Sequence, residues 1–175
     1  MWGFVAGGQA ADMPKSPDDL FAKLKELGIE TKTYTHPPLF TVEESQRLRG
    51  DLPGGHCKSL FFKDKKEKYW LVVTLEDRPV DIKLLESRLG SARLSFARPE
   101  RLMQVLGVIP GSVTPFALIN DTERQVTVIL DQQMLEHDPL NYHPLHNAAT
   151  TAIAPVDLLK FIQSCGHEPR VIDLS

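Results

Sequence analysis

The chain has 175 residues, of which 42% are hydrophobic and 25% charged, as is typical of one globular domain that buries its own core. Its net charge of −3 argues against a broad basic surface for nucleic acid but allows a local basic patch. Because no run of 18 apolar residues is present, we expect no membrane-spanning helix. Two cysteines without a CxxC pair indicate reduced thiols and a cytoplasmic protein.

The first 12 residues are apolar but lack the positive charges that begin a secretory signal peptide. A second methionine, Met13, precedes the first helix signal. We therefore interpret residues 1–12 as a leader or tag without fixed structure, and expect a single domain at 13–175.

Five helices are expected, each beginning at a capping residue or at a proline suited to the first helical turn: 17–27, 41–49, 81–88, 99–106 and 155–164. Short apolar or alternating runs between turn residues predict strands at 29–35, 57–63, 69–75, 91–97, 116–119, 125–130, 141–145, 150–153 and 171–172. The charged connection at 64–68 indicates that 57–63 and 69–75 form a hairpin. The pattern predicts a mixed α/β (α+β) domain in which antiparallel pairing is common.

Several enzyme signatures are absent from the sequence, namely the P-loop, the dinucleotide-binding glycine pattern, HExxH and GxSxG. His143 and His146 lie three residues apart, which on a strand places them on opposite faces, and Pro144 disfavours a helix there. Metal ligation is therefore disfavoured. Cys57 begins an apolar strand, where an inert buried thiol is the usual case, so a Cys–His nucleophile is disfavoured too.

Two segments could carry chemistry on their own residues. Lys58 follows the glycines of residues 54–55 and enters a strand, so it could direct a point charge at a phosphate or carboxylate, or simply be solvated. The segment from Gly111 to Pro115 could present successive backbone amides to a carbonyl or oxyanion, or be an ordinary loop.

Four segments in register carry a resemblance to a known family: THPPLFTVEE at 35–44, KSLFF at 58–62, LGVIPGSVTPF at 106–116 and NYHPL at 141–145. Over residues 16–173 the chain resembles the YbaK/prolyl-tRNA-synthetase-associated editing domains, and within them the freestanding Ala-tRNA(Pro) deacylases. The resemblance implies one domain with a mixed, largely antiparallel, barrel-like sheet surrounded by helices. It implies hydrolysis of the ester in mischarged Ala-tRNA(Pro). Because His143 and His146 lack a third ligand, we expect this activity to need no metal, and we expect no other cofactor.

Such an activity has a physical reason, because a synthetase pocket shaped for proline cannot exclude the smaller alanine and a second sieve is needed. The partners implied are the acceptor end of tRNA and, further, prolyl-tRNA synthetase, with no membrane. Two alternatives stay open. One is a deacylase for mischarged Cys- or Ser-tRNA. The other is a non-catalytic tRNA-binding module, since five lysines stand against Asp64 and Glu67 within residues 58–68.

The resemblance also implies residue roles. Catalytic roles fall to Lys58, which engages the 3′-terminal nucleotide, to Gly111, whose loop amides hold the aminoacyl carbonyl, and to His143 in the substrate pocket. Substrate-binding roles fall to Ser59, Ser112, Val113, Thr114, Pro115 and His36. Many relatives carry Asn where this chain has the shorter Ser59, which leaves the role of that position open. No residue of these motifs is an obvious general base, so the resemblance assigns positioning of the attacking water to the ribose 2′-hydroxyl.

Overall fold

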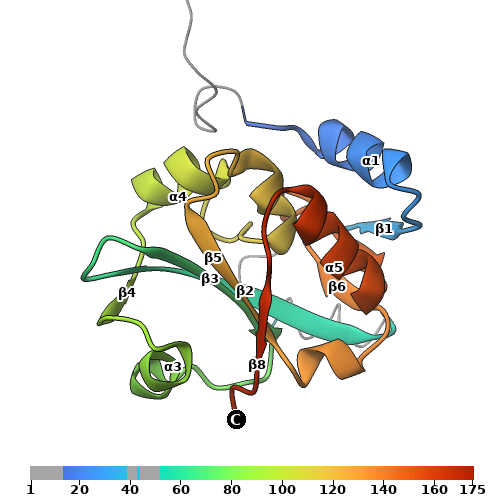
Figure 1. Cartoon of the computed structure of the whole chain (residues 1–175). Coiled ribbons are helices and arrows are strands. Elements are labelled where there is room, and N and C mark those ends of the chain that lie inside the picture. The colour runs from blue at the N-terminus through green and yellow to red at the C-terminus, as the bar shows by residue number, and fades with distance from the viewer. Residues whose placement is uncertain (1–13, 39–42, 44–51) are drawn as a thin grey trace, which may run out of the picture.

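The strands form one mixed sheet in the computed structural model, which describes residues 14–38, 43 and 52–175 (Figure 1). Its strands are β1 (Lys32–Thr35), β2 (Gly55–Asp64), β3 (Tyr69–Leu75), β4 (Leu94–Phe96), β5 (Val126–Asp131), β6 (Leu140–Tyr142), β7 (Ala149–Ile153) and β8 (Arg170–Ile172). The described helices are α1 (Pro17–Glu26), α3 (Ile82–Leu89), α4 (Pro99–Leu106) and α5 (Pro155–Ser164), with 3-10 turns η1 (Pro115–Asn120) and η2 (Met134–Glu136). None of these helices is long and apolar enough to cross a membrane.

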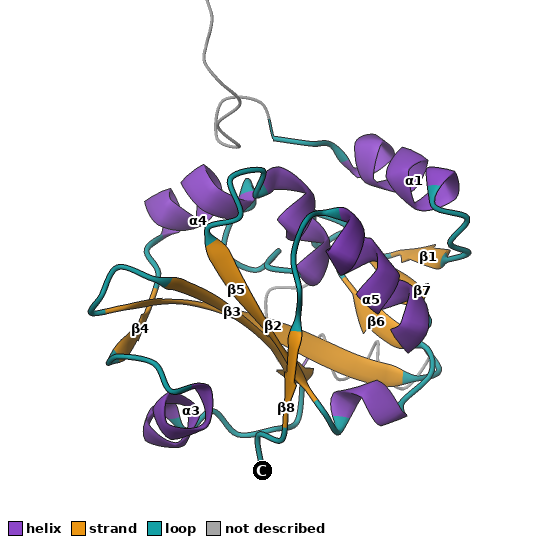
Figure 2. Cartoon of the chain, viewed as in Figure 1, coloured by secondary structure: helices purple, strands orange, loops and turns teal. Residues whose placement is uncertain are grey.

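The sheet runs in the order β1-β7-β6-β2-β3-β5-β8, and β4 pairs with β2 outside this path. The predicted hairpin is confirmed: β2 and β3 are antiparallel, with Lys58 opposite Thr74. Among the described strands, β1–β7, β6–β7 and β2–β4 are also antiparallel, whereas β2–β6, β3–β5 and β5–β8 are parallel. The predicted mixed α/β class is therefore confirmed (Figure 2).

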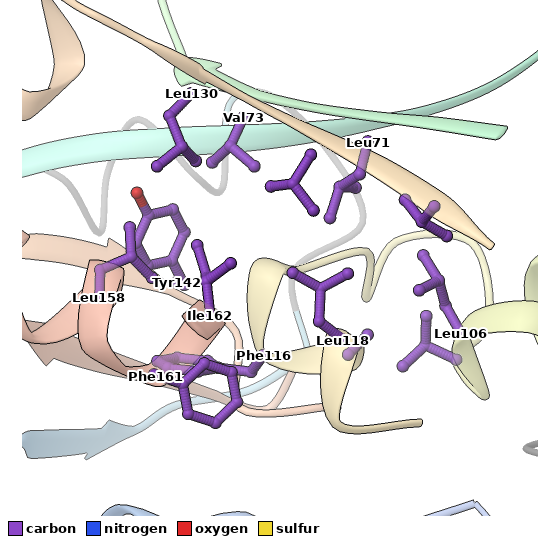
Figure 3. Packing of buried hydrophobic residues seen from close by; sticks show 14 of the residues in the cluster. Leu71, Val73, Leu106, Phe116, Leu118, Leu130, Tyr142, Leu158, Phe161 and Ile162 are labelled. Carbon is purple, nitrogen blue, oxygen red and sulfur yellow. The ribbon is translucent and has the colours of Figure 1, made fainter. Parts of the chain in front are cut away.

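Two hydrophobic clusters cover the two faces of the central strands, because successive side chains of a strand point to opposite faces. Leu71 and Val73 of β3 belong to a large cluster with α1, α4, η1 and α5, and Figure 3 shows them on the side of Leu118 of η1 and Ile162 of α5. Val72, between them, belongs to a smaller cluster with α3 on the other face. Burial on both faces explains why β3 is almost continuously apolar.

Local signals predicted most helix ends correctly. In α3, the Asp81 carboxylate accepts the N–H of Leu84, and Gly90 ends the helix in the left-handed conformation at φ 67°. Helices α4 and α5 begin at Pro99 and Pro155, as predicted. The predicted leader and the predicted helix at 41–49 lie outside the described residues, except for Glu43.

The predicted strand at 116–119 is wrong, because this segment forms the 3-10 turn η1. Thr114 accepts the N–H of Phe116 at 3.3 Å, and Pro115 supplies a first residue fixed at a helical φ. A short, fully buried apolar run has no periodicity that separates a strand from a turn of helix. Three other strands are shorter than predicted. The segment 29–35 is a strand only at Lys32–Thr35, 91–97 only at Leu94–Phe96, and 141–145 stops at Tyr142.

Candidate active site

A pocket of about 220 Å³, here called the candidate pocket, opens where β2 and β6 meet the loop after α4. β2 and β6 are parallel neighbours, with His56 beside Asn141, so their side chains converge on one site. The described residues that line the pocket are His56, Cys57, Lys58, Ser59, Glu76, Gly111, Val113, Asn141, Tyr142, His143 and Thr150.

Five residues singled out from the sequence share this pocket: Lys58, Ser59, Gly111, Val113 and His143. They come from three segments far apart in the sequence, so the fold rather than any single motif assembles them. Ser59 is half-buried and lines the pocket beside Lys58.

His36 lies behind the pocket rather than in its lining. Its Nε2 is 2.9 Å from the Oγ1 of Thr150, which does line the pocket, and its ring centroid is 6.4 Å from that of His143. His36 therefore supports the wall of the pocket formed by Thr150 and His143.

Lys58 is held in a defined position. Its Nζ donates a hydrogen bond to the backbone carbonyl of Arg78 at 2.5 Å. Burial lowers the pKa of Lys58, while the nearby carboxylates of Glu76 and Asp77 act in the opposite direction. An anion brought to this amine by a ligand would be paired with a partly desolvated cation, where the attraction is stronger than in bulk water.

The carbonyl that holds Lys58 is itself anchored. The fully buried Asp131 accepts a hydrogen bond from the Nε of Arg78 at 2.8 Å and one from the Oγ1 of Thr74 at 2.6 Å. Thr74 pairs with Lys58 across the hairpin. A buried, fully paired carboxylate therefore fixes both the strand opposite Lys58 and the residue that accepts its hydrogen bond.

His143 has a defined tautomer in its neutral form. Its Nδ1 is 3.1 Å from the carbonyl oxygen of Ala149, and because a carbonyl only accepts, Nδ1 carries the hydrogen. Burial lowers the pKa of His143, and the neighbouring His36 and His146 lower it further, against the hydrogen bond to Ala149. The neutral imidazole consequently keeps a lone pair on Nε2 for a ligand.

The loop of residues 111–115 offers fewer amides than the sequence suggests. Ser112 donates its N–H to the carbonyl of Ile109 at 3.0 Å, and Pro115 has no N–H. The side chains of Ser112, Thr114 and Pro115 are buried and do not line the pocket. The loop amides left for a carbonyl are those of Gly111, Val113 and Thr114, of which the first two belong to residues that line the pocket.

Sequence reasoning missed five polar lining residues, His56, Glu76, Asn141, Tyr142 and Thr150. Asn141 donates from Nδ2 to the carbonyls of Pro53 and Gly55, both at 3.0 Å, and so ties β6 to the loop before Lys58. A buried Asn within a short apolar strand is the one sequence signal that could have indicated this role.

Cys57 also lines the pocket, but desolvation by the surrounding side chains raises the pKa of its thiol to about 12. A thiol in that state is a poor nucleophile. Across the described ranges, 14–38, 43 and 52–175, no group of three His, Cys, Asp or Glu residues could hold a metal ion.

The chain is similar to known proteins over most of its length. The family model described as the aminoacyl-tRNA editing domain matches residues 36–161. The chain is 41% identical to the prolyl-tRNA synthetase associated domain-containing protein 1 of Danio rerio, covering 95% of this chain and 92% of that one. It is 33% identical to the prolyl-tRNA editing protein ProX of Acetoanaerobium sticklandii, covering 89% and 95%. A crystal structure of a candidate trans-editing enzyme for prolyl-tRNA synthetase has the same fold, with a TM-score of 0.68, 20% identity and coverage of 91% and 98%.

Proposed function

The chain belongs to the aminoacyl-tRNA editing domain family, and we propose that it is a trans-editing deacylase that hydrolyses the ester of mischarged Ala-tRNA(Pro). The observation that carries this proposal is the candidate pocket, in which Lys58, Gly111 and His143 converge from three separate segments. The names of the relatives point to prolyl-tRNA and to its editing.

In the proposed mechanism the ester carbonyl lies against the N–H groups of Gly111 and Val113, which stabilise the oxyanion as water attacks. Lys58 holds the phosphate or ribose of the terminal nucleotide through the face of its amine not used by Arg78. The ribose 2′-hydroxyl positions the water. Because an aminoacyl ester is already activated, orientation and oxyanion stabilisation supply most of the acceleration.

Selection of alanine over proline rests on exclusion by size. A volume of about 220 Å³ must hold the amino acid together with the ester, and the surrounding strands are tied together by hydrogen bonds. The ring of proline is joined back to its own nitrogen, so it would overlap walls such as Val113 and His143. Packed walls of this kind yield poorly to added methylenes.

We further propose that the reaction needs no metal or other cofactor, that the protein works in the cytoplasm, and that its partner is the acceptor end of tRNA, with docking to prolyl-tRNA synthetase as an additional step. The neutral imidazole of His143 can accept a hydrogen bond from the substrate or the water. Polar groups of the chain, together with the ribose 2′-hydroxyl of the substrate, can therefore serve each step.

The decisive experiment is deacylation of a panel of radiolabelled aminoacyl-tRNAs. We expect rapid loss of alanine from Ala-tRNA(Pro), a stable Pro-tRNA(Pro), and the same alanine rate after treatment with EDTA. Faster release of serine or cysteine would reassign the specificity. Binding of tRNA without release of any amino acid would indicate a non-catalytic module. A rate that collapses in EDTA and returns with zinc would overturn the metal-independent mechanism.

A further inference from the structure

The mechanism above uses the hydrogen-bond donors of the candidate pocket but leaves most of its acceptors without a role. Lys58 and two loop amides are donors, and each has been given a partner on the nucleotide or the ester carbonyl. The pocket is also lined by Glu76, Asn141 and Thr150, to which the mechanism assigns no step. What these three residues offer a ligand therefore bears on the part of the substrate not yet accounted for.

Glu76 brings a negative charge to the candidate pocket. Its backbone N–H donates to the carbonyl of His56 at 2.8 Å, which extends the β2–β3 pairing by one residue and fixes where the side chain begins. Burial is the largest influence on the pKa values of Lys58, Cys57 and His143, and the carboxylate of Glu76 raises all three. Because all three residues line the pocket, a charge that acts on each of them lies close to the space that they enclose.

Asn141 supplies a buried acceptor. Only 3% of its surface is exposed, and its Nδ2 donates to two backbone carbonyls, those of Pro53 and Gly55. Its Oδ1 has no hydrogen-bond partner among the described residues. Buried polar atoms in folded proteins are almost always hydrogen-bonded. Since Asn141 lines the pocket, a donor group on a ligand can satisfy this oxygen.

Thr150 presents an acceptor as well. The Nδ1 of His36 is 2.8 Å from the carbonyl oxygen of Pro37, and because a carbonyl only accepts, Nδ1 carries the hydrogen of the neutral ring. The Nε2 of His36 then accepts the hydroxyl hydrogen of Thr150 at 2.9 Å. The oxygen of Thr150 keeps lone pairs but no hydrogen for the pocket. Together with the Nε2 lone pair of His143, the pocket therefore has several neutral acceptors and one carboxylate.

We propose that these acceptors bind the α-ammonium group of the aminoacyl ester, with the carboxylate of Glu76 as its counter-ion. This inference rests on the proposed function. An ammonium group has a positive charge and three hydrogens to donate, which match a carboxylate accompanied by neutral acceptors. Its nitrogen is two bonds from the carbonyl carbon of the ester, so both groups fit one pocket. An amine held in its charged form also withdraws electrons from the carbonyl, which favours attack by water.

Ammonium binding gives the deacylase a criterion that size alone does not supply. An ester whose nitrogen is acylated brings no charge to Glu76 and places an acyl group against the carboxylate. The site therefore selects free amino acids esterified to tRNA and rejects esters with a blocked amine, such as those of peptidyl-tRNA. In this role Glu76 determines specificity.

The first test compares Ala-tRNA(Pro) with lactyl-tRNA(Pro), in which a hydroxyl replaces the amine at nearly the same size. Each rate is divided by the uncatalysed hydrolysis rate of the same ester, so that intrinsic reactivity cancels. We expect the wild type to prefer the alanyl ester roughly 10- to 100-fold, the range of a hydrogen bond to a charged group. Glu76→Gln should lose most of this preference by slowing the alanyl ester alone, and Glu76→Asp, which keeps the charge, should recover part of it. Equal slowing of both esters in Glu76→Gln, or a wild type without preference, would overturn the proposal.

Asp77 provides the matched control. Burial lowers the pKa of Lys58, and the carboxylates of Glu76 and Asp77 both oppose this shift. Asp77 is exposed and is not among the described residues that line the pocket. We expect Asp77→Asn to leave the ratio of alanyl to lactyl rates unchanged. A loss as large as in Glu76→Gln would show that general charge near Lys58 sets the ratio, and Glu76 would lose its assigned role.

The second test measures binding without catalysis. The probes are 3′-amino-3′-deoxyadenosine acylated with alanine or with lactic acid, in which an amide replaces the ester, and each is titrated into the isotope-labelled full chain by NMR. We expect the wild type to bind the alanyl probe at least about fivefold more tightly, and Glu76→Gln to bind both alike. Equal affinities in the wild type, or no binding of either probe, would contradict an ammonium site.

The two tests separate this inference from the proposed function. If the probes show a preference that depends on Glu76 but no aminoacyl-tRNA is hydrolysed, the deacylase proposal fails and the ammonium site stands. If Ala-tRNA(Pro) is hydrolysed but Glu76→Gln leaves the ratio of alanyl to lactyl rates unchanged, the deacylase proposal stands and the ammonium site fails.

Discussion

Lys58 is positioned by residues distant from it in the sequence. Its amine is fixed by the carbonyl of Arg78, and Arg78 is fixed by the buried Asp131. A lysine free in solvent would have to give up conformational freedom each time it bound an anion, at a cost of up to about 2 kcal/mol. Here that cost is met when the protein folds.

The first prediction concerns the amine itself. Lys58→Ala should lower kcat/KM for Ala-tRNA(Pro) by roughly 10²-fold, because the terminal nucleotide is no longer held in position. Lys58 is only partly buried and its strand partner is Thr74, so the fold should survive, as checked by circular dichroism and urea unfolding. Turnover at the wild-type rate would remove Lys58 from the mechanism.

The second prediction concerns the shape of the candidate pocket. His143→Ala should enlarge the pocket, so that alanine is held more loosely and released more slowly from tRNA(Pro), while 2-aminobutyrate loses less or gains. The measurement is the ratio of deacylation rates on tRNA(Pro) charged with each amino acid. An unchanged ratio would show that His143 does not shape the pocket.

The third prediction follows from the pKa of His143, which burial lowers below its ordinary value of 6.5. The folded state therefore binds fewer protons than the unfolded state between the lowered pKa and 6.5, so stability is fully present above 6.5 and is lost as the pH falls toward the lowered pKa. His143→Gln keeps a polar side chain that does not titrate. Its unfolding free energy should fall less than that of the wild type between about pH 7.5 and about pH 5. Equal losses would mean that His143 titrates normally.

At the scale of elements, predictability depended on how local the signal is. Helices α3, α4 and α5 could be located because a cap or an N-terminal proline acts within one turn. The pairing of β3 with β5 places Leu71 beside Val128, and no pattern near either residue indicates that contact. The turn η1 was predicted as a strand because nearly all of its residues are buried. Its sequence therefore lacks the alternation of apolar and polar residues that would distinguish a helical turn from a strand.

The distance between interacting residues in the sequence also explains which site residues could be predicted. Lys58 and the 111–115 loop could be proposed from short motifs, because their chemistry depends on neighbours in sequence. Glu76 and Thr150 enter the candidate pocket through strand pairing, Glu76 at the end of the β2–β3 hairpin and Thr150 on β7, where it pairs with Tyr34 of β1. Such residues become visible only when the sheet is assembled.

The fourth prediction compares two glycines that end helices in the left-handed conformation, Gly90 at φ 67° and Gly107 at φ 68°. Gly90→Ala should cost about 1 kcal/mol of unfolding free energy, since an added Cβ meets nothing within 4 Å. At Gly107 the Cβ would come within 2.7 Å of the Nδ2 of Asn120.

Asn120 cannot yield without loss, because it donates to the carbonyl of Leu106 at 2.9 Å and accepts the N–H of Lys15 at 2.7 Å. Gly107→Ala should therefore cost at least about 1 kcal/mol more than Gly90→Ala, measured by urea denaturation of both variants. Equal costs would show that only backbone strain matters at the two positions, and that the contact with Asn120 relaxes freely.

At the scale of the whole molecule, charge limits how tRNA can be held. The chain is net negative, and two of its cations are already engaged, since Lys63 pairs with Glu67 at 2.6 Å and Arg78 with Asp131. Attraction to a polyanion must therefore come from a few local contacts. Shape and stacking at the single-stranded 3′ end would supply the rest of the affinity.

The fifth prediction tests this balance through salt. Each phosphate contact to a single strand contributes a slope of about −0.7 to a plot of log affinity against log salt concentration. If Lys58 provides the main contact, the slope for Ala-tRNA(Pro), measured from the salt dependence of 1/KM, should lie between about −0.7 and −2. Lys58→Ala should make it shallower by about 0.7, whereas Lys65→Ala, in the exposed hairpin turn, should change it little. A slope steeper than about −4 would instead reveal a broad basic surface, as the tRNA-binding alternative requires. In that case Lys65→Ala would flatten the slope as much as Lys58→Ala does, and the specific role of Lys58 would be lost.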